Sequence, residues 1–172
     1  MSRSLPAGQG LISIAAALLA LCLMSEVSAA PGEGIRFHRY TQDDGLVQNT
    51  VQAIAQDAQG FIWLGTEDGL HRFDGYEMRV YQSRPGEQEG LQADGVQSLL
   101  IDKDGDLWIG TYGGGVSRLS AGDARFTHFR HDASNARSLR SDYIFRLALN
   151  SDGRIWVVGT EGIDLLDPAT GD

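Results

Sequence analysis

The sequence contains little cysteine, little proline and a single long apolar run. Its 172 residues include one cysteine, Cys22, and four prolines. If the segment that holds Cys22 is removed, the rest of the chain has no thiol, which excludes a disulfide framework, a cysteine-ligated metal and a cysteine nucleophile. The apolar run from Leu11 to Met24 is shorter than the roughly 20 residues that a membrane-spanning helix needs. No later apolar stretch is long enough for such a helix.

Positive charge is also scarce. The chain has 14 lysines and arginines against 23 acidic residues, a formal net charge of −9. An acidic surface repels phosphate backbones and anionic lipid, so nucleic-acid binding and electrostatic docking on membranes are disfavoured. Apolar residues make up 42% of the chain, which is enough for a packed core.

Residues 1–29 have the features of a secretory signal peptide. A weakly positive start leads into the apolar run, and a Val-Ser-Ala stretch ending at Ala29 supplies the small residues of a cleavage site. An uncleaved amino-terminal anchor is the alternative. A lipid anchor on Cys22 is disfavoured because Leu21 stands where lipoprotein signals need a small residue. In each case we expect the rest of the chain to be exported, to the periplasm.

The most informative feature is a repeat. Three tryptophans stand 45 and 48 residues apart, each follows a glycine by three positions, and the flanking residues recur in register over about twenty positions. The pairs are Gly60 and Trp63, Gly105 and Trp108, and Gly153 and Trp156. We interpret these residues as structural members of repeats at about 45–81, 90–129 and 138–168. For the tryptophans, burial in a core is favoured over stacking on a ligand, because each ring buries roughly 150–250 Å².

Each copy predicts short β-strands separated by turns rich in glycine, aspartate and asparagine. In the first copy we expect strands at 51–56, 61–64, 70–73 and 76–81. In the second they fall at 96–101, 107–109, 116–119 and 125–129, and in the third at 144–149, 155–158 and 163–166. The fourth strand of the third copy has its counterpart at the amino end, where residues 35–40 resemble 125–129.

Four strands per repeat at this period are typical of a β-propeller blade. The expected fold class is all-β, with three four-stranded blades across residues 30–172 and an outer strand at 35–40 that would complete the last blade of a ring. Closed propellers have 4–8 blades, so three blades leave an incomplete ring. We therefore expect the remaining blades in a longer natural chain, with self-association of three-blade units as the less favoured alternative.

The repeat resembles that of the two-component regulator propeller family, whose mark is D-x-x-G-x-[IL]-W-[LIV]-G-T-x-x-G-[LV]. The first copy matches it at Asp57, Gly60, Trp63, Gly65, Thr66, Gly69 and Leu70. The second matches at Asp102, Gly105, Trp108, Gly110, Thr111, Gly115 and Val116, with one extra residue in the glycine turn. The third departs from it, with Asn150 for the aspartate and Val158-Gly159 for Gly-Thr. The resemblance spans about 35–168.

This resemblance implies a function that the repeats alone do not. Such propellers form the extracytoplasmic sensor half of membrane receptors, followed by further blades, a β-sandwich, one transmembrane helix and a cytoplasmic histidine kinase or diguanylate cyclase. The chain would then be a ligand-sensing or interaction module that is truncated before any output domain. As given it is not expected to be an enzyme, whereas its full-length parent would be one.

No catalytic constellation, cofactor motif or metal site stands out. The acidic run Asp102–Asp106 lacks the spacing of a calcium loop and is interpreted as a hairpin turn. His38 and His128 are expected to be solvated residues of outer strands, and His128 and His131 to lie on opposite faces. The glycines at 113–115 precede a strand and not a helix, which excludes a phosphate cradle.

Glu67, Asp68 and Tyr112 are the candidate ligand contacts, because they occupy the turns between second and third strands. Such turns face one side of a propeller, where ligands often bind. The expected partners are a glycan or another small extracellular ligand and the remaining blades, with no nucleic acid. The alternatives are a secreted propeller enzyme of the streptogramin-lyase type, which needs clustered histidine and acidic residues, and a non-catalytic adaptor.

Overall fold

The computed structural model describes residues 35–87, 89–122 and 124–170. The predicted signal peptide, 1–29, lies outside the described residues. Within them, no helix has the length and apolar character needed to cross a membrane. The chain divides into two units, residues 1–38 and 39–172. The described part of the first unit, residues 35–38, has irregular, exposed backbone.

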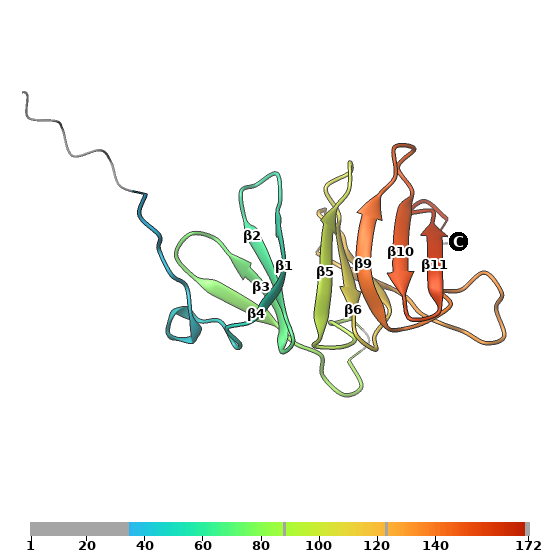
Figure 1. Ribbon diagram of the computed structural model, residues 1–172, viewed down its shortest axis with the longest axis horizontal. Coiled ribbons are helices and arrows are strands. Elements are labelled where there is room, and N and C mark those ends of the chain that lie inside the picture. The colour runs from blue at the N-terminus through green and yellow to red at the C-terminus, as the bar shows by residue number, and fades with distance from the viewer. Residues whose placement is uncertain (1–34, 88, 123, 171–172) are drawn as a thin grey trace, which may run out of the picture. The chain divides into compact units, whose positions relative to one another are not determined.

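The described residues of the second unit form three antiparallel sheets that follow one another along the chain (Figure 1). A short 3-10 helix, η1 (Gln42–Asp44), precedes them. The first sheet consists of β1 (Val51–Gln56), β2 (Ile62–Thr66), β3 (Gly69–Phe73) and β4 (Met78–Tyr81). The second consists of β5 (Val96–Ile101), β6 (Leu107–Thr111), β7 (Val116–Leu119) and β8 (Phe126–Phe129), and the third of β9 (Ile144–Leu149), β10 (Ile155–Gly159) and β11 (Gly162–Leu166). The all-β, blade-like architecture is confirmed, and the ring is not closed.

The outer strand predicted at 35–40 is not formed, and the third sheet accordingly has three strands among the described residues. A strand needs a neighbour to satisfy its backbone N–H and C=O groups, and the prediction relied on the last blade of a closed ring as that neighbour. Tyr40 instead packs on Phe73, with ring centroids 4.9 Å apart.

The core lies between consecutive sheets. The first strands are neighbours, with β5 between β1 and β9. Trp63 packs among residues of the second sheet, including Val96 and Ile109, and Trp108 packs among residues of the third, including Ile144. Trp63 and Trp108 are 5% and 0% exposed, whereas Trp156 is 41% exposed. Each tryptophan thus faces the following sheet and is buried only where that sheet covers it.

An aspartate clamps the turn that precedes each of the first two tryptophans. Asp102 Oδ1 accepts the N–H groups of Asp104 and Asp106 at 2.9 and 3.0 Å, and Oδ2 accepts the Nε1–H of Trp108 at 2.7 Å. Asp57 does the same in the first sheet, with Trp63 at 2.8 Å. The residues from Asp102 to Asp106 therefore form a hairpin turn. In the third sheet, Asp152 and not Asn150 accepts the equivalent backbone N–H, from Arg154.

Candidate functional site

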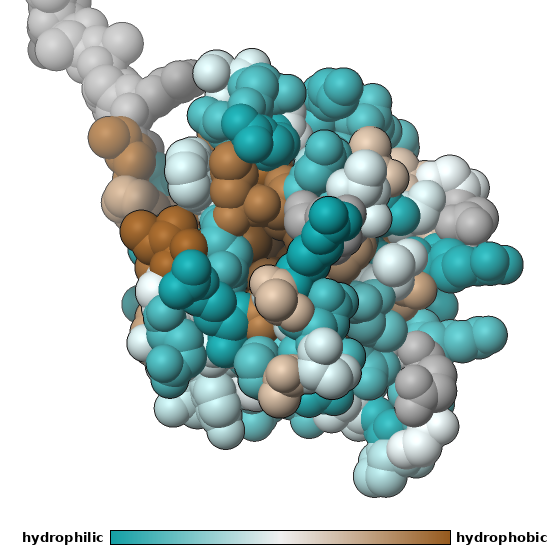
Figure 2. All heavy atoms as spheres, turned by 90° about the vertical axis from the view of Figure 1, so that its right-hand side faces the viewer, coloured by the Kyte–Doolittle hydropathy of each residue, from teal (hydrophilic) through white to brown (hydrophobic). Residues whose placement is uncertain are grey.

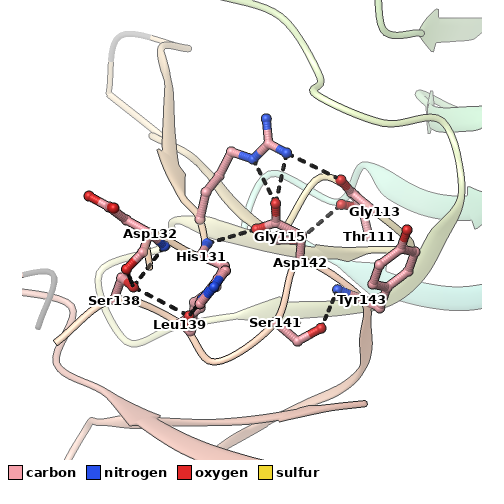
Figure 3. A network of polar contacts seen from close by, with 11 residues as sticks. Thr111, Gly113, Gly115, His131, Asp132, Ser138, Leu139, Ser141, Asp142 and Tyr143 are labelled. Carbon is pink, nitrogen blue, oxygen red and sulfur yellow. Dashed lines mark hydrogen bonds and ion pairs between the residues drawn. The ribbon is translucent and has the colours of Figure 1, made fainter. Parts of the chain in front are cut away.

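An open groove of about 990 Å³ lies where the second and third sheets meet, at the end of the sheets that carries the turns after β6 and β10. The loop 130–143, which joins β8 to β9, forms most of its wall (Figure 3). Its polar and aromatic lining includes Tyr112, Asp132, Asn135, Arg140, Tyr143 and Glu161.

A pair of tyrosines from the two sheets stands at this groove. Tyr112 and Tyr143 form an isolated β-bridge, and their rings meet edge to face with centroids 4.8 Å apart. The backbone fixes both residues: Tyr112 N–H donates to the Gly95 carbonyl at 2.7 Å, and Tyr143 N–H donates to Ser141 Oγ at 3.0 Å. Both side chains remain about half exposed, so each presents an aromatic surface held by rigid backbone.

A charged network holds the loop against the glycine turn after β6. The Arg130 guanidinium contacts Asp142 Oδ2 through Nη2 at 2.8 Å and Nε at 3.2 Å. The Asp142 carbonyl accepts the N–H groups of Gly113 and Gly115, and its Oδ1 accepts the N–H of His131 (Figure 3). One aspartate thus joins the loop to the preceding sheet, which gives the glycines at 113–115 a structural role.

Hydrogen bonds between residues of the loop hold the rest of it. His131 Nδ1 lies 2.7 Å from the Leu139 carbonyl oxygen, and the Asp132 N–H donates to Ser138 Oγ at 2.8 Å (Figure 3). The Ser134 hydroxyl and backbone N–H both donate to the Asp132 carboxylate and lower its pKa. Asp132 therefore stays charged at neutral pH and presents an exposed carboxylate at the groove.

The structure brings only one of the three predicted contacts to this groove. Tyr112 lines it, whereas Glu67 and Asp68 lie in the corresponding turn of the first sheet. Glu67 there accepts the side-chain amides of Gln48 and Gln52 at 3.2 and 3.5 Å. Sequence reasoning missed Tyr143. The available signal was that an aromatic residue precedes β9 where Gly95 precedes β5.

Three of the four histidines contact neighbouring segments, whereas His38 is exposed. His128, expected to be solvated, is half-buried, with Nδ1 2.9 Å from Ser117 Oγ and Nε2 3.4 Å from Gln92 Nε2. His131 lies beyond β8, so the expected opposition of faces on one strand does not apply. His71, which the sequence did not single out, is fully buried, and its Nε2 accepts the Val47 N–H at 3.1 Å. Burial lowers the pKa of His71, against the opposing effect of the Leu64 and Gly69 backbone.

One of these contacts has a counterpart in the third sheet. The strand register places His71, Ser117 and Asp164 at equivalent positions of the third strands. Asp164 accepts the Arg140 N–H at 3.1 Å, as His71 accepts the Val47 N–H. Each accepted N–H follows a buried leucine that precedes the sheet: Leu46 and Leu139. The buried imidazole therefore positions the segment that leads into the first strand, which is a structural role.

The other ends of the sheets carry an acidic cavity of about 530 Å³. Arginines accompany its carboxylates: Arg154 pairs with Asp152 at 2.6 Å, and Arg118 lies 3.7 Å from Asp106. The hydrogen bond from Arg154 lowers the pKa of Asp152. Among the described residues, no group of three or more histidine, cysteine, aspartate or glutamate side chains is arranged to hold a metal ion.

Comparison with known proteins identifies the repeat. The sequence model of the two-component regulator propeller family matches residues 45–68 and 90–113. A histidine kinase of Formosa agariphila is 45% identical over 49 residues, which is 28% of this chain and 4% of the kinase.

Two solved structures show the fold. One is described as the extracellular domain of a hybrid two-component system of B. thetaiotaomicron. It is 26% identical with a TM-score of 0.73, over 78% of this chain and 19% of that one. Virginiamycin B lyase of Staphylococcus aureus is 16% identical with a TM-score of 0.55, over 74% and 41% of the two chains.

The first two repeats are thus two-component regulator propeller repeats, and the resemblance seen in the sequence is confirmed. The match is to a regulatory extracellular domain, which confirms the prediction that the chain as given is not an enzyme. The similarity to the lyase concerns the fold alone. The chain spans about a fifth of the length of the solved two-component relative, and a smaller share of the kinase.

Proposed function

We propose that this chain is part of the extracytoplasmic ligand-sensing domain of a receptor of the two-component type, and that the groove between the second and third sheets binds a carbohydrate. The proposal is supported by the family of the repeats and by the similarity to an extracellular domain of a hybrid two-component system. The single observation that carries the location is the half-exposed pair of Tyr112 and Tyr143 at the groove.

The lining suits a sugar better than a lipid or a nucleic acid. An aromatic ring offers an apolar face on which the C–H face of a pyranose can pack, and hydroxyl groups need hydrogen-bond acceptors close by. The Asp132 carboxylate is an acceptor, Asn135 offers both donor and acceptor atoms, and Arg140 adds donors. The acidic net charge and the absence of a long apolar lining disfavour phosphate-rich and acyl ligands.

In this proposal the chain acts in the periplasm, and further blades, a membrane span and a kinase or cyclase output belong to the receptor that contains it. The first and third sheets each have one face that no other described sheet covers. Apolar residues on these two faces are exposed where their counterparts on the covered faces are buried, which supports further blades. A sugar that bridges the second and third sheets would bias their relative placement, which is the kind of change that a receptor can transmit.

Calorimetric titration of the chain without its predicted signal peptide, residues 1–29, with a panel of neutral and acidic oligosaccharides tests the proposal. For a sugar that binds, we expect Tyr112→Ala and Tyr143→Ala each to weaken binding about 10-fold, because each removes an aromatic contact surface. Tyr76→Ala is the matched control, since Tyr76 is 94% exposed in the turn before β4 and lies outside the groove.

Two results would contradict the proposal. A sugar whose affinity is the same in the tyrosine variants and the control would locate binding elsewhere. No binding heat and no rise in thermal midpoint with any oligosaccharide would favour an adaptor that takes no small ligand.

A further inference from the structure

The face of each sheet that looks toward the following sheet, here called the trailing face, can be compared at equivalent positions. The strand register aligns Trp63, Trp108 and Trp156 on this face, and beside them Leu70, Val116 and Ile163. Leu70 and Val116 are fully buried, whereas Ile163 is 59% exposed. Figure 2, which looks onto the side of the third sheet, shows apolar residues gathered among polar ones.

Each of the two covered trailing faces has a glycine at its centre. A Cβ on Gly65 would lie 2.5 Å from Val96 Cγ1, and a Cβ on Gly110 would lie 2.8 Å from Ile144 Cγ2. Val96 and Ile144 are the first residues of β5 and β9, so the missing side chain is what lets the next first strand approach. The glycine and the branched residue therefore form one complementary contact, repeated at both interfaces.

The third trailing face lacks this glycine. Its register places Val158 at the position of Gly65 and Gly110. It also places Arg146 where the second sheet has Ser98, whose hydroxyl accepts the N–H of Leu147 across the interface at 3.0 Å. The first sheet has Ala53 at this position, so Arg146 is the one large side chain of the three. The third trailing face thus has a side chain where the other two have space.

From this difference we infer that the trailing face of the third sheet binds a blade whose first strand carries glycine, alanine or serine where β5 and β9 carry Val96 and Ile144. The occupant is a β-sheet of the same kind, because a sheet covers both equivalent faces within this chain. The contact is reversed: the branched residue belongs to the third sheet and the small one to its neighbour.

The same geometry disfavours head-to-tail assembly of copies of this chain. The open face of the first sheet presents Val51, which is equivalent to Val96 and is 41% exposed. Seated on the third sheet of a second copy, Val51 would meet Val158, and two branched side chains would occupy the space that now holds one. Overpacking of this kind weakens association by about 10- to 100-fold.

Sedimentation of the exported chain tests the inference, with Val51→Gly and Val158→Gly as variants that remove the clash from opposite sides. We expect the unmodified chain to stay monomeric at about 100 µM, a concentration well above a Kd typical of specific association. Each glycine variant should associate at least about 10-fold more tightly. Val51→Ala, which keeps more strand propensity, guards against misfolding, and near-ultraviolet circular dichroism checks each variant.

Adding Ile163→Arg to either glycine variant should restore the monomer, because it places a charge on the trailing face. The inference is overturned if the unmodified chain associates as tightly as the variants and Ile163→Arg disrupts that association. It is also overturned if all three clash-relieving variants are folded and sediment as the unmodified chain does.

Discussion

The clamp formed by Asp102 allows a quantitative prediction. Replacing Asp102 by alanine removes the acceptor of three N–H groups, those of Asp104, Asp106 and the Trp108 ring. The Trp108 side chain is fully buried, so its indole N–H loses a charged partner, at a cost of about 1.5–3 kcal/mol. The two backbone groups can turn to water and add roughly 0.5–1 kcal/mol. We expect Asp102→Ala to lower the unfolding free energy by about 2–4 kcal/mol.

For a chain of this size the loss corresponds to a fall in thermal midpoint of about 4–16 °C, measurable by circular dichroism. Asp104→Ala is the matched control: Asp104 is exposed in the same turn, and its removal should change the unfolding free energy by less than about 0.5 kcal/mol. Asp102→Asn should resemble alanine more than aspartate, because its amide has one acceptor oxygen and must turn its NH2 group toward either the indole N–H or the two backbone N–H groups. Equal midpoints for Asp102→Ala and Asp104→Ala would refute the assignment of the clamp.

Three further perturbations follow from the same contacts. Gly110→Ala, whose new Cβ meets Ile144, should lower the unfolding free energy measured in urea by about 1–3 kcal/mol. The control Gly122→Ala, whose new Cβ has no heavy atom within 4 Å, should leave it nearly unchanged. Equal losses in the two variants would contradict the close approach of the sheets. His71→Gln should reduce the fall in unfolding free energy that accompanies a fall in pH below about 6.5. Burial lowers the pKa of His71 from 6.5, so below that pH the unfolded chain binds a proton at His71 more readily than the folded chain does. The stabilisation is therefore complete above about pH 6.5, and the unfolding free energy falls by up to about 1.4 kcal/mol per pH unit below it. An unchanged fall with pH in His71→Gln would count against that burial. Asp142→Ala removes the partner of Arg130, so it should increase proteolysis within residues 130–143 and leave proteolysis of the β4–β5 loop unchanged. Equal cleavage of both loops would point to general destabilisation.

Local pattern was enough to predict the blades, because strand and turn signals recur in register and each sheet is built from contiguous residues. Residues 35–40 failed as a strand for a non-local reason: a strand depends on a partner that no local pattern supplies. The same limit applies to the three tryptophans. They look alike in sequence, yet Trp156 differs from Trp108 in exposure because covering depends on the following sheet.

The candidate site was only partly predictable. The position of Tyr112 in a turn between second and third strands predicted the end of the sheet at which it lies, since repeat register determines that end. Tyr143 and Asp132 lie in an irregular loop whose shape depends on Asp142, Arg130 and the Gly113–Gly115 backbone. Contacts between side chains and backbone across two sheets have no periodic signature. The Asp102–Trp108 hydrogen bond lies within one sheet and recurs as Asp57–Trp63, but the spacing of the two residues alone does not show that their side chains meet.

Hydrogen exchange with and without a bound oligosaccharide tests the central claim most directly, because it reports where a ligand contacts the sheets. The account predicts slower exchange at Tyr112–Gly115 and in the loop 130–143, and no change in the turns at 102–106 and 150–154 at the opposite ends of the strands. Protection of those opposite turns, with the loop 130–143 unaffected by a sugar that binds, would contradict it.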